Sequence, residues 1–352
     1  MNPRAHGPAC PLKARERSMG MAAMAAPLLG IACVAFGCAA ASIPGPAAAQ
    51  GAATQPYPSR VVRFVVPFAP AGGTDILARS LAERMSVSMG RQVVVDNRPG
   101  ANSMIGTELV AKASPDGHVL LFTTNVFTIN PSLYPTSPVN AERDFAPITI
   151  AGSAPNLLGV HPSIPARTVK QLIALSRAQP GTLTMSAAGI GTPSHLAGEL
   201  FKQMARIDIL TVQYRGTGAS LADVAGGQVA MTLGALPGLM PLVQGGKLRA
   251  LGVSGTRRVP ALPHVPLIAD TLPGFDIEVW YAAFAPGKSP REIVTRVHQE
   301  IVKALAHPDV RQLLAAQGYE AGGMSPAELA KLIRLDLQRW AKVIRAGNIH
   351  PE

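Results

Sequence analysis

The chain has 352 residues, of which 47% are hydrophobic and only 15% are charged, a composition that excludes a disordered protein. Aromatic residues make up 5%, whereas glycine (34) and proline (32) are abundant. The formal net charge of +11 could attract nucleic acid, but the basic residues do not cluster and aromatic residues for base stacking are few, so we expect no nucleic-acid binding.

Residues 1–49 have the layout of a secretory signal peptide. Four basic side chains lie in residues 1–18, no charge occurs in 19–43, and a run of three alanines ends at Ala49. We expect export to the periplasm with cleavage near Ala49. An uncleaved membrane anchor and a lipid attached to Cys38 are the alternatives.

Cleavage there would change both the charge and the thiol content of the protein. The signal region carries four basic residues and one acidic residue, so the mature chain would have a net charge of +8. All three cysteines would also be lost. The mature protein would then contain no disulfide, no cysteine-bound metal and no cysteine nucleophile.

Strand-like and helix-like patterns alternate after this region. β-branched residues predict a strand at 60–68, and apolar residues with a helical period predict a helix at 76–89. A strand at 92–95, a helix from about 102 to 113 and a strand at 118–123 follow.

The second half of the chain repeats this alternation, which predicts a mostly parallel sheet covered by helices on both faces. A proline-rich stretch at 257–274 has little periodicity and is predicted to be an extended surface crossing. Strands are expected at 183–187, 209–214, 228–233 and 248–253, and helices at 169–178, 195–205, 219–225, 291–306, 309–317 and 326–345.

Three glycine-containing loops each leave a predicted strand and enter a helix: loop 1 (67–75), loop 2 (187–195) and loop 3 (214–218). Ligands of open α/β sheets bind at the carboxyl ends of the strands. Glycine permits close approach of the backbone, and a helix start offers N–H groups and partial positive charge to an anion. A small carboxylate suits such a site.

The alternative for any single loop is a plain turn followed by a helix cap. Three such loops in one chain favour a binding site. Asp75 is expected to cap its helix or to bond the loop backbone. His195 fits a buried hydrogen-bonding role and a ligand contact equally well.

Enzyme motifs are missing from the sequence. Ser194 occupies the position where a dinucleotide fingerprint requires a third glycine, and neither a phosphate loop nor a Gly-x-Ser-x-Gly elbow occurs. The histidines lack the spacing of metal ligands. We therefore expect no catalytic residues, no cofactor and no metal.

Four segments occur in a distinctive order and spacing: VVRFVVPFAPAGGTDILAR, VVVDNRPGANSMIGTELVAKASPDGH, AGIGTPSHLAGELF and VQYRGTGASLADVAGGQV. In these segments the mature chain resembles the Bug-type periplasmic solute receptors of tripartite tricarboxylate transporters over nearly its whole length. The resemblance implies a type II-like periplasmic binding protein. Its two α/β lobes, each with a mostly parallel sheet flanked by helices, would be joined by two hinge crossings.

The resemblance also implies how the chain is divided and where it binds. Lobe 1 would comprise 57–153 and 279–352, and lobe 2 would comprise 154–278. Backbone amides of loops 1 and 2, often with ordered water, would hold the ligand carboxylate. The expected ligand-binding residues are Phe68, Ala71, Gly72, Gly73, Thr74, Asp75, Asn125, Ala188, Gly189, Ile190, Thr192, His195, Arg215, Gly216 and Thr217.

The implied function is capture of a small carboxylate, such as a di- or tricarboxylate, an amino-acid-like acid or an aromatic acid. The partners would be the membrane components of the transporter, and the receptor is expected to be a monomer. A sensor subunit for a membrane kinase and an enzyme acting on carboxylates in the same cleft are the alternatives. One departure from the family is the pair Gly234-Ala235, which replaces a commonly polar or acidic pair and favours an apolar or aromatic ligand body.

Overall fold

The structure is a computed structural model that describes residues 57–351. The chain divides into two units, Met1–Ala53 and Thr54–Glu352, and the described residues belong to the second. The expected signal peptide, its cleavage site and the alternative lipidation site lie outside the described residues. Within residues 57–351, no helix combines the length and the apolar character that a membrane span requires.

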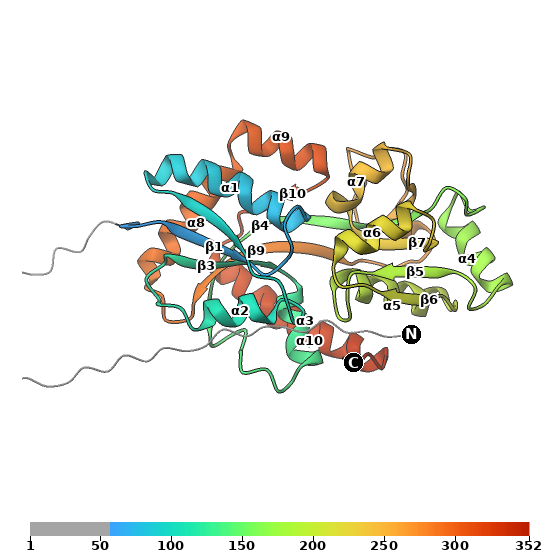
Figure 1. Cartoon of the computed structure of the whole chain (residues 1–352), viewed down its shortest axis with the longest axis horizontal. Helices are drawn as coiled ribbons and strands as arrows, with labels where there is room; N and C mark the ends of the chain where they lie inside the picture. The colour runs from blue at the N-terminus through green and yellow to red at the C-terminus, as the bar shows by residue number, and fades with distance from the viewer. Residues whose placement is uncertain (1–56, 352) are drawn as a thin grey trace, which may run out of the picture. The chain divides into compact units, whose positions relative to one another are not determined.

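A mixed β-sheet runs through the described part of the chain (Figure 1). Its ten strands are β1 (Val62–Val66), β2 (Val93–Asn97), β3 (Val119–Thr124), β4 (Phe145–Val160), β5 (Thr184–Ala187), β6 (Leu210–Gln213), β7 (Met231–Ala235), β8 (Arg249–Val253), β9 (Glu278–Pro286) and β10 (Glu320–Ala321). They follow the order β2-β1-β3-β9-β4-β7-β5-β6, and β8 and β10 each pair with β4.

Strand β4 belongs to two groups of strands. Its first part, from Phe145 to Pro155, pairs with β9, which in turn pairs with β3. Its last part, from Asn156 to Val160, pairs with β7 and β8. The partner of β4 therefore changes between Pro155 and Asn156, and the fold is a two-lobed α/β fold with one group of strands in each lobe.

Helices cover both faces of both groups. Phe64 and Val65 are neighbours on β1 and point to opposite faces. Phe64 packs with α1, α8 and α9, and Val65 packs with α2, α3 and α10. The helices are α1 (Gly73–Met89), α2 (Met104–Ala111), α3 (Val126–Leu133), α4 (Val169–Ala178), α5 (Pro193–Ala205), α6 (Thr217–Ala225), α7 (Leu236–Gln244), α8 (Arg291–Leu305), α9 (Pro308–Gln317) and α10 (Pro326–Ala346).

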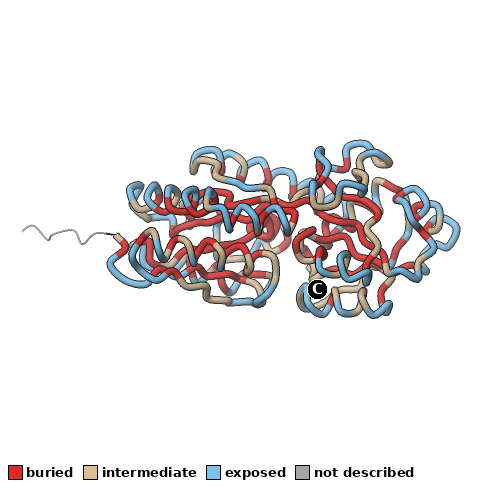
Figure 2. Tube along the Cα trace, turned by 90° about the horizontal axis from the view of Figure 1, so that it is seen from above, coloured by how far each residue is buried: buried red, intermediate tan, exposed pale blue. Residues whose placement is uncertain are grey.

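The second group is covered in the same way. Leu157 and Leu158 are neighbours on β4, and both are fully buried. Leu157 packs with α6 and α7, whereas Leu158 packs with α4 and α5. Figure 2 shows the result: buried backbone follows the central strands, and exposed segments lie on the surrounding helices and loops.

The prediction of a two-lobed α/β fold is confirmed, but the prediction of mostly parallel sheets needs a correction. Parallel pairing holds within β1, β2 and β3 and within β5, β6 and β7. The crossing strands β4 and β9 pair antiparallel with all their neighbours. Strand β4 and helices α3 and α7 were not predicted because each contains proline. The prolines are Pro147 and Pro155 in β4, Pro131 in α3 and Pro241 in α7.

Candidate functional site

Loop 1 joins β1 to α1 and is held in place by Asp75. The Asp75 carboxylate accepts hydrogen bonds from the backbone N–H of Ala71 (2.9 Å), from Arg79 (2.9 Å) and from Nδ2 of Asn97 (3.0 Å). Nδ2 of Asn97 also donates to the carbonyl oxygen of Phe68 (3.1 Å). Burial alone would raise the pKa of Asp75, but these hydrogen bonds together lower it below its usual value. Asp75 is therefore charged at neutral pH and bonds the loop backbone.

The start of α1 presents backbone N–H groups without partners. Gly72 precedes the helix with an extended backbone (φ −78°, ψ 165°), and no side chain caps this helix end. Within residues 57–351, the N–H groups of Gly72, Gly73 and Thr74 form no hydrogen bond. Such groups, together with the helix dipole, attract an anion.

Loop 2 joins β5 to α5 and is closed by short polar side chains. The hydroxyl of Thr192 donates to the carbonyl oxygen of Gly189 (2.7 Å), and the hydroxyl of Ser194 accepts from the N–H of Ala188 (3.3 Å). The N–H groups of Gly189 and Ile190 form no hydrogen bond in the described part of the chain. Loop 2 thus offers a second set of amide donors.

His195 supports the backbone of loop 2. Its Nδ1 accepts a hydrogen bond from the N–H of Gly191 (3.0 Å), and its Nε2 lies 3.6 Å from the carboxylate of Glu199. Burial lowers the pKa of His195 below its usual value, although Glu199 opposes this shift. The neutral imidazole keeps Nδ1 free to accept. His195 therefore has a buried hydrogen-bonding role, and a contact between His195 and the ligand stays a prediction.

Loop 3 is bonded directly to loop 2. The N–H of Gly216 donates to the carbonyl oxygen of Ala188 (2.9 Å). The hydroxyl of Tyr214 donates to Asp223 of α6 (2.6 Å), which fixes the loop on its own helix. Arg215 and Thr217 are exposed, and Arg215 forms no ion pair with any described residue.

The segment from Gly234 to Pro237, where β7 leads into α7, lies between loops 1 and 2. A Cβ atom placed on Gly73 would lie 3.6 Å from Cβ of Pro237. A Cβ atom placed on Gly234 would lie 3.8 Å from Cβ of Ser194. The structure therefore brings the expected residues of loop 1 close to those of loops 2 and 3, with a segment of Gly, Ala, Leu and Pro between them.

Asn125 lies at a different place, beside the chain that enters β9. Its Nδ2 donates to the carbonyl oxygen of Glu278 (3.0 Å), and it is almost fully buried. Nδ2 of Asn156 donates to the preceding carbonyl oxygen, that of Ile277 (2.9 Å). Asn125 therefore contacts a crossing between the two groups of strands, and no hydrogen bond in the described residues joins it to loops 1, 2 or 3.

Two tyrosines at loop 1 were not expected from the sequence. The hydroxyl of Tyr319 donates to the carbonyl oxygen of Gly73 (2.7 Å), and the ring of Tyr281 packs edge-on against that of Tyr319, with centroids 5.3 Å apart. Tyr281 lies on β9, a strand that was not predicted. Had the segment VWYAAF been predicted as a strand, its alternate residues would have been assigned to one face of the sheet. Tyr281 would then have been a candidate for that face.

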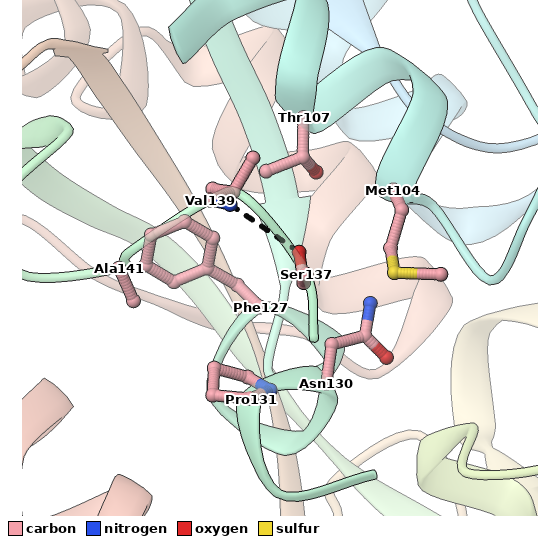
Figure 3. A pocket seen from close by; sticks show the side chains of 8 residues that line it. All are labelled: Met104, Thr107, Phe127, Asn130, Pro131, Ser137, Val139 and Ala141. Atoms are coloured by element: carbon pink, nitrogen blue, oxygen red, sulfur yellow. Dashed lines mark hydrogen bonds between the residues drawn. The ribbon is translucent and has the colours of Figure 1, made fainter. Parts of the chain in front are cut away.

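A small cavity lies between α2, α3 and the segment that follows α3 (Figure 3). Its volume is about 30 Å³. One buried water needs about 10–15 Å³ on this measure, so the cavity holds little more than water. The lining residues are Met104, Thr107, Phe127, Asn130, Pro131, Ser137, Val139 and Ala141.

Among the described residues, no group of three or more His, Cys, Asp or Glu side chains is placed to hold a metal ion. The chemistry available at loops 1 and 2 is that of neutral amide donors at two helix starts, which suits an anionic group on a small molecule.

Two lobes crossed by β4 and β9, with amide-lined loops at the strand ends, define a two-lobed α/β solute-binding protein. Residues 77–349 match the family model described as tripartite tricarboxylate transporter family receptor, TctC. The chain belongs to this family, and the resemblance to Bug-type receptors is confirmed.

Individual relatives agree with this assignment. The chain is 40% identical to a protein encoded between tcbD and tcbE in Pseudomonas sp. strain P51, covering 82% of this chain and 86% of that protein. It is 33% identical to protein BugT of Bordetella pertussis, covering 82% of this chain and 90% of BugT. The solved structure of R. palustris Rpa4515 with adipate has a TM-score of 0.81 and 35% identity, and the match covers 84% of this chain and all of that one.

Proposed function

We propose that the protein is an extracytoplasmic binding protein that captures a small carboxylate between its lobes for a tripartite tricarboxylate transporter. The observation that carries this proposal is the arrangement of loops 1 and 2 on either side of Gly234–Pro237. Each loop presents unpartnered N–H groups at a helix start, and a carboxylate can accept hydrogen bonds from both. The relative with adipate supports this ligand class.

The expected ligand-binding residues have different roles in this proposal. Backbone amides of loops 1 and 2 contact the carboxylate, while the side chains of Asp75, Thr192 and His195 hold these loops in shape. Arg215 of loop 3 is exposed and unpaired in the described structure, which suits a second anionic group on the ligand.

We propose that lobe 1 comprises residues 57–153 together with 279–352, and that lobe 2 comprises residues 154–278. The change of β4 partners at Pro155 supports one hinge crossing there. The second crossing is proposed at Ile277–Glu278, and the hydrogen bonds that Asn156 and Asn125 donate to these two successive carbonyl groups support it. The last turns of α10 reach over lobe 2, where Trp340 packs in the same cluster as Leu158.

Catalysis is not part of the proposal. Ser59, His118 and Asp116 resemble a nucleophile, base and acid, with Oγ of Ser59 3.4 Å from Nε2 of His118. However, this Nε2 already accepts the backbone N–H of Ser59 (3.2 Å), and Nδ1 of His118 makes no aligned hydrogen bond in the described structure. His118 therefore ties the chain to β3 and is not poised to remove the Ser59 proton. We propose binding without turnover.

The cellular location and the oligomeric state of the protein are also proposals. Export by the signal region 1–49 would deliver a monomer to the periplasm, where it would meet the membrane components of the transporter. Membership of the receptor family supports this partner. Amino-terminal sequencing of exported protein should begin near Gln50, and light scattering should give the mass of one chain.

Calorimetry tests the binding function. The mature protein is unfolded and refolded to release any co-purified molecule, then titrated with adipate, with shorter and longer dicarboxylates, and with aromatic acids. At least one carboxylate is expected to bind, and its neutral amide is expected to fail. Equal binding of acid and amide, or binding of neither across the panel, would refute carboxylate capture.

A further inference from the structure

Tyr281 has a buried ring and an unused hydroxyl. Only 2% of the residue is exposed, yet its hydroxyl forms no hydrogen bond with any residue of 57–351. The hydroxyl oxygen is not one of the fully enclosed polar atoms that lack a partner among the described residues, so the ring is buried while the oxygen faces space that a ligand or water can reach. In the same cluster, the hydroxyl of Tyr319 already donates a hydrogen bond to the carbonyl oxygen of Gly73.

The position of this hydroxyl is at the start of α1. A Cβ atom placed on Gly73 would lie 3.3 Å from Oη of Tyr281 and 2.9 Å from Oη of Tyr319. The missing side chain of Gly73 thus lets both hydroxyls approach the helix start. The unpartnered N–H groups of Gly72, Gly73 and Thr74 lie at the same helix end.

The ring of Tyr281 is held rigidly. Its strand β9 pairs on both sides, with Thr124 of β3 and Gly152 of β4 opposite Tyr281. The edge-on contact with Tyr319 fixes the ring itself (68° between planes). A donor fixed in this way loses little conformational entropy when it binds a ligand.

We infer that Tyr281 is a ligand-binding residue whose hydroxyl donates a hydrogen bond to the carboxylate at the start of α1. The inference rests on the proposed function and adds a side-chain donor to a site otherwise built from backbone amides. Burial raises the pKa of Tyr281 far above its usual value, so the hydroxyl stays protonated and able to donate at any physiological pH.

The test compares Tyr281→Phe with Tyr57→Phe by calorimetry against adipate, or against the tightest carboxylate of the panel. Tyr57 is a matched control because its hydroxyl donates to the carbonyl of Gly117 (2.7 Å), far along the chain from loop 1. Tyr281→Phe should weaken binding about tenfold or more, the effect of one charge-assisted hydrogen bond, and Tyr57→Phe should leave affinity unchanged.

Thermal unfolding of the ligand-free variants separates binding from structure. Removing an unpartnered hydroxyl should leave the Tm of Tyr281→Phe equal to or above that of the wild type. Unchanged affinity, or an affinity loss accompanied by a lower ligand-free Tm, would overturn the inference while leaving the proposed function intact. If the wild type itself binds no carboxylate of the panel, the proposed function fails and this inference fails with it.

Discussion

Pro237 packs against the position that a side chain of Gly73 would occupy, with 3.6 Å between Cβ of Pro237 and a Cβ atom placed on Gly73. The two residues belong to α7 and α1, which follow strands of different lobes. Oη of Tyr319 is even closer to this position, at 2.9 Å. A side chain at residue 73 would therefore meet Pro237 at ordinary contact distance but would be too close to the hydroxyl of Tyr319.

Gly73→Val should weaken carboxylate binding about tenfold or more, because the valine must displace the tyrosine hydroxyls and Pro237 from the helix start. Gly73 does not have the positive φ that would make strain the cause. Calorimetry of the variant measures the effect. Gly238→Ala is the control, since a Cβ atom at Gly238 meets nothing within 4 Å. Normal binding by Gly73→Val would show that the ligand does not depend on this helix start.

Gly189→Val should weaken binding through backbone strain, which is a different cause from that at Gly73. Gly189 has φ 148°, which L-residues rarely adopt, so a valine would force loop 2 into another conformation. The amides of Gly189 and Ile190 would then point elsewhere. Calorimetry should show a loss of about tenfold or more, while circular dichroism should show an intact fold. Lys303→Ala, on the exposed side of α8, should bind normally, and a loss in that variant instead would indicate a surface-charge site.

Acid should destabilise the protein through His195. Its pKa is lowered in the folded state by burial, so below pH about 6.5 the unfolded chain takes up a proton more readily than the folded chain. The stability contributed by neutral His195 is complete above that pH and declines as the pH falls towards the folded pKa. Protonation of Nδ1 would also break its hydrogen bond from Gly191 and loosen loop 2.

Urea unfolding between pH 8 and pH 5 checks this linkage. The wild type should lose stability over this range more steeply than His195→Asn, in which an amide oxygen replaces Nδ1 as acceptor without titrating. His264→Asn, at an exposed position, should follow the wild type. Identical pH profiles for wild type and His195→Asn would exclude His195 as the source.

The sequence predicted the lobes and loops because their signals are local. A β-branched run marks β1, and glycines mark the turns into α1, α5 and α6. The crossing strands escaped prediction because Pro147 and Pro155 interrupt β4 and because β9 pairs only with residues far away in the chain. The role of Tyr281 was not predicted for the same reason. Its proximity to Gly73 depends on tertiary packing that no local sequence pattern encodes.

Ligand should close the lobes about Pro155 and Ile277–Glu278, the two places where the chain changes partners. X-ray scattering should therefore show a smaller radius of gyration at saturating carboxylate. Gly189→Val, at the same ligand concentration, should keep the larger value because its site is mostly empty. A wild-type profile that does not change at saturation would contradict hinge closure.

The central claim is that backbone amides at two helix starts hold one carboxylate, and amide chemical shifts test it most directly. Deuterated, ¹⁵N-labelled protein is titrated with the carboxylate that binds in calorimetry. The largest downfield shifts of amide protons are predicted for Gly72, Gly73, Gly189 and Ile190, whose N–H groups form no other hydrogen bond in the described structure. Shifts confined to another region, such as the cavity beside Met104, with these four amides unmoved, would contradict the account.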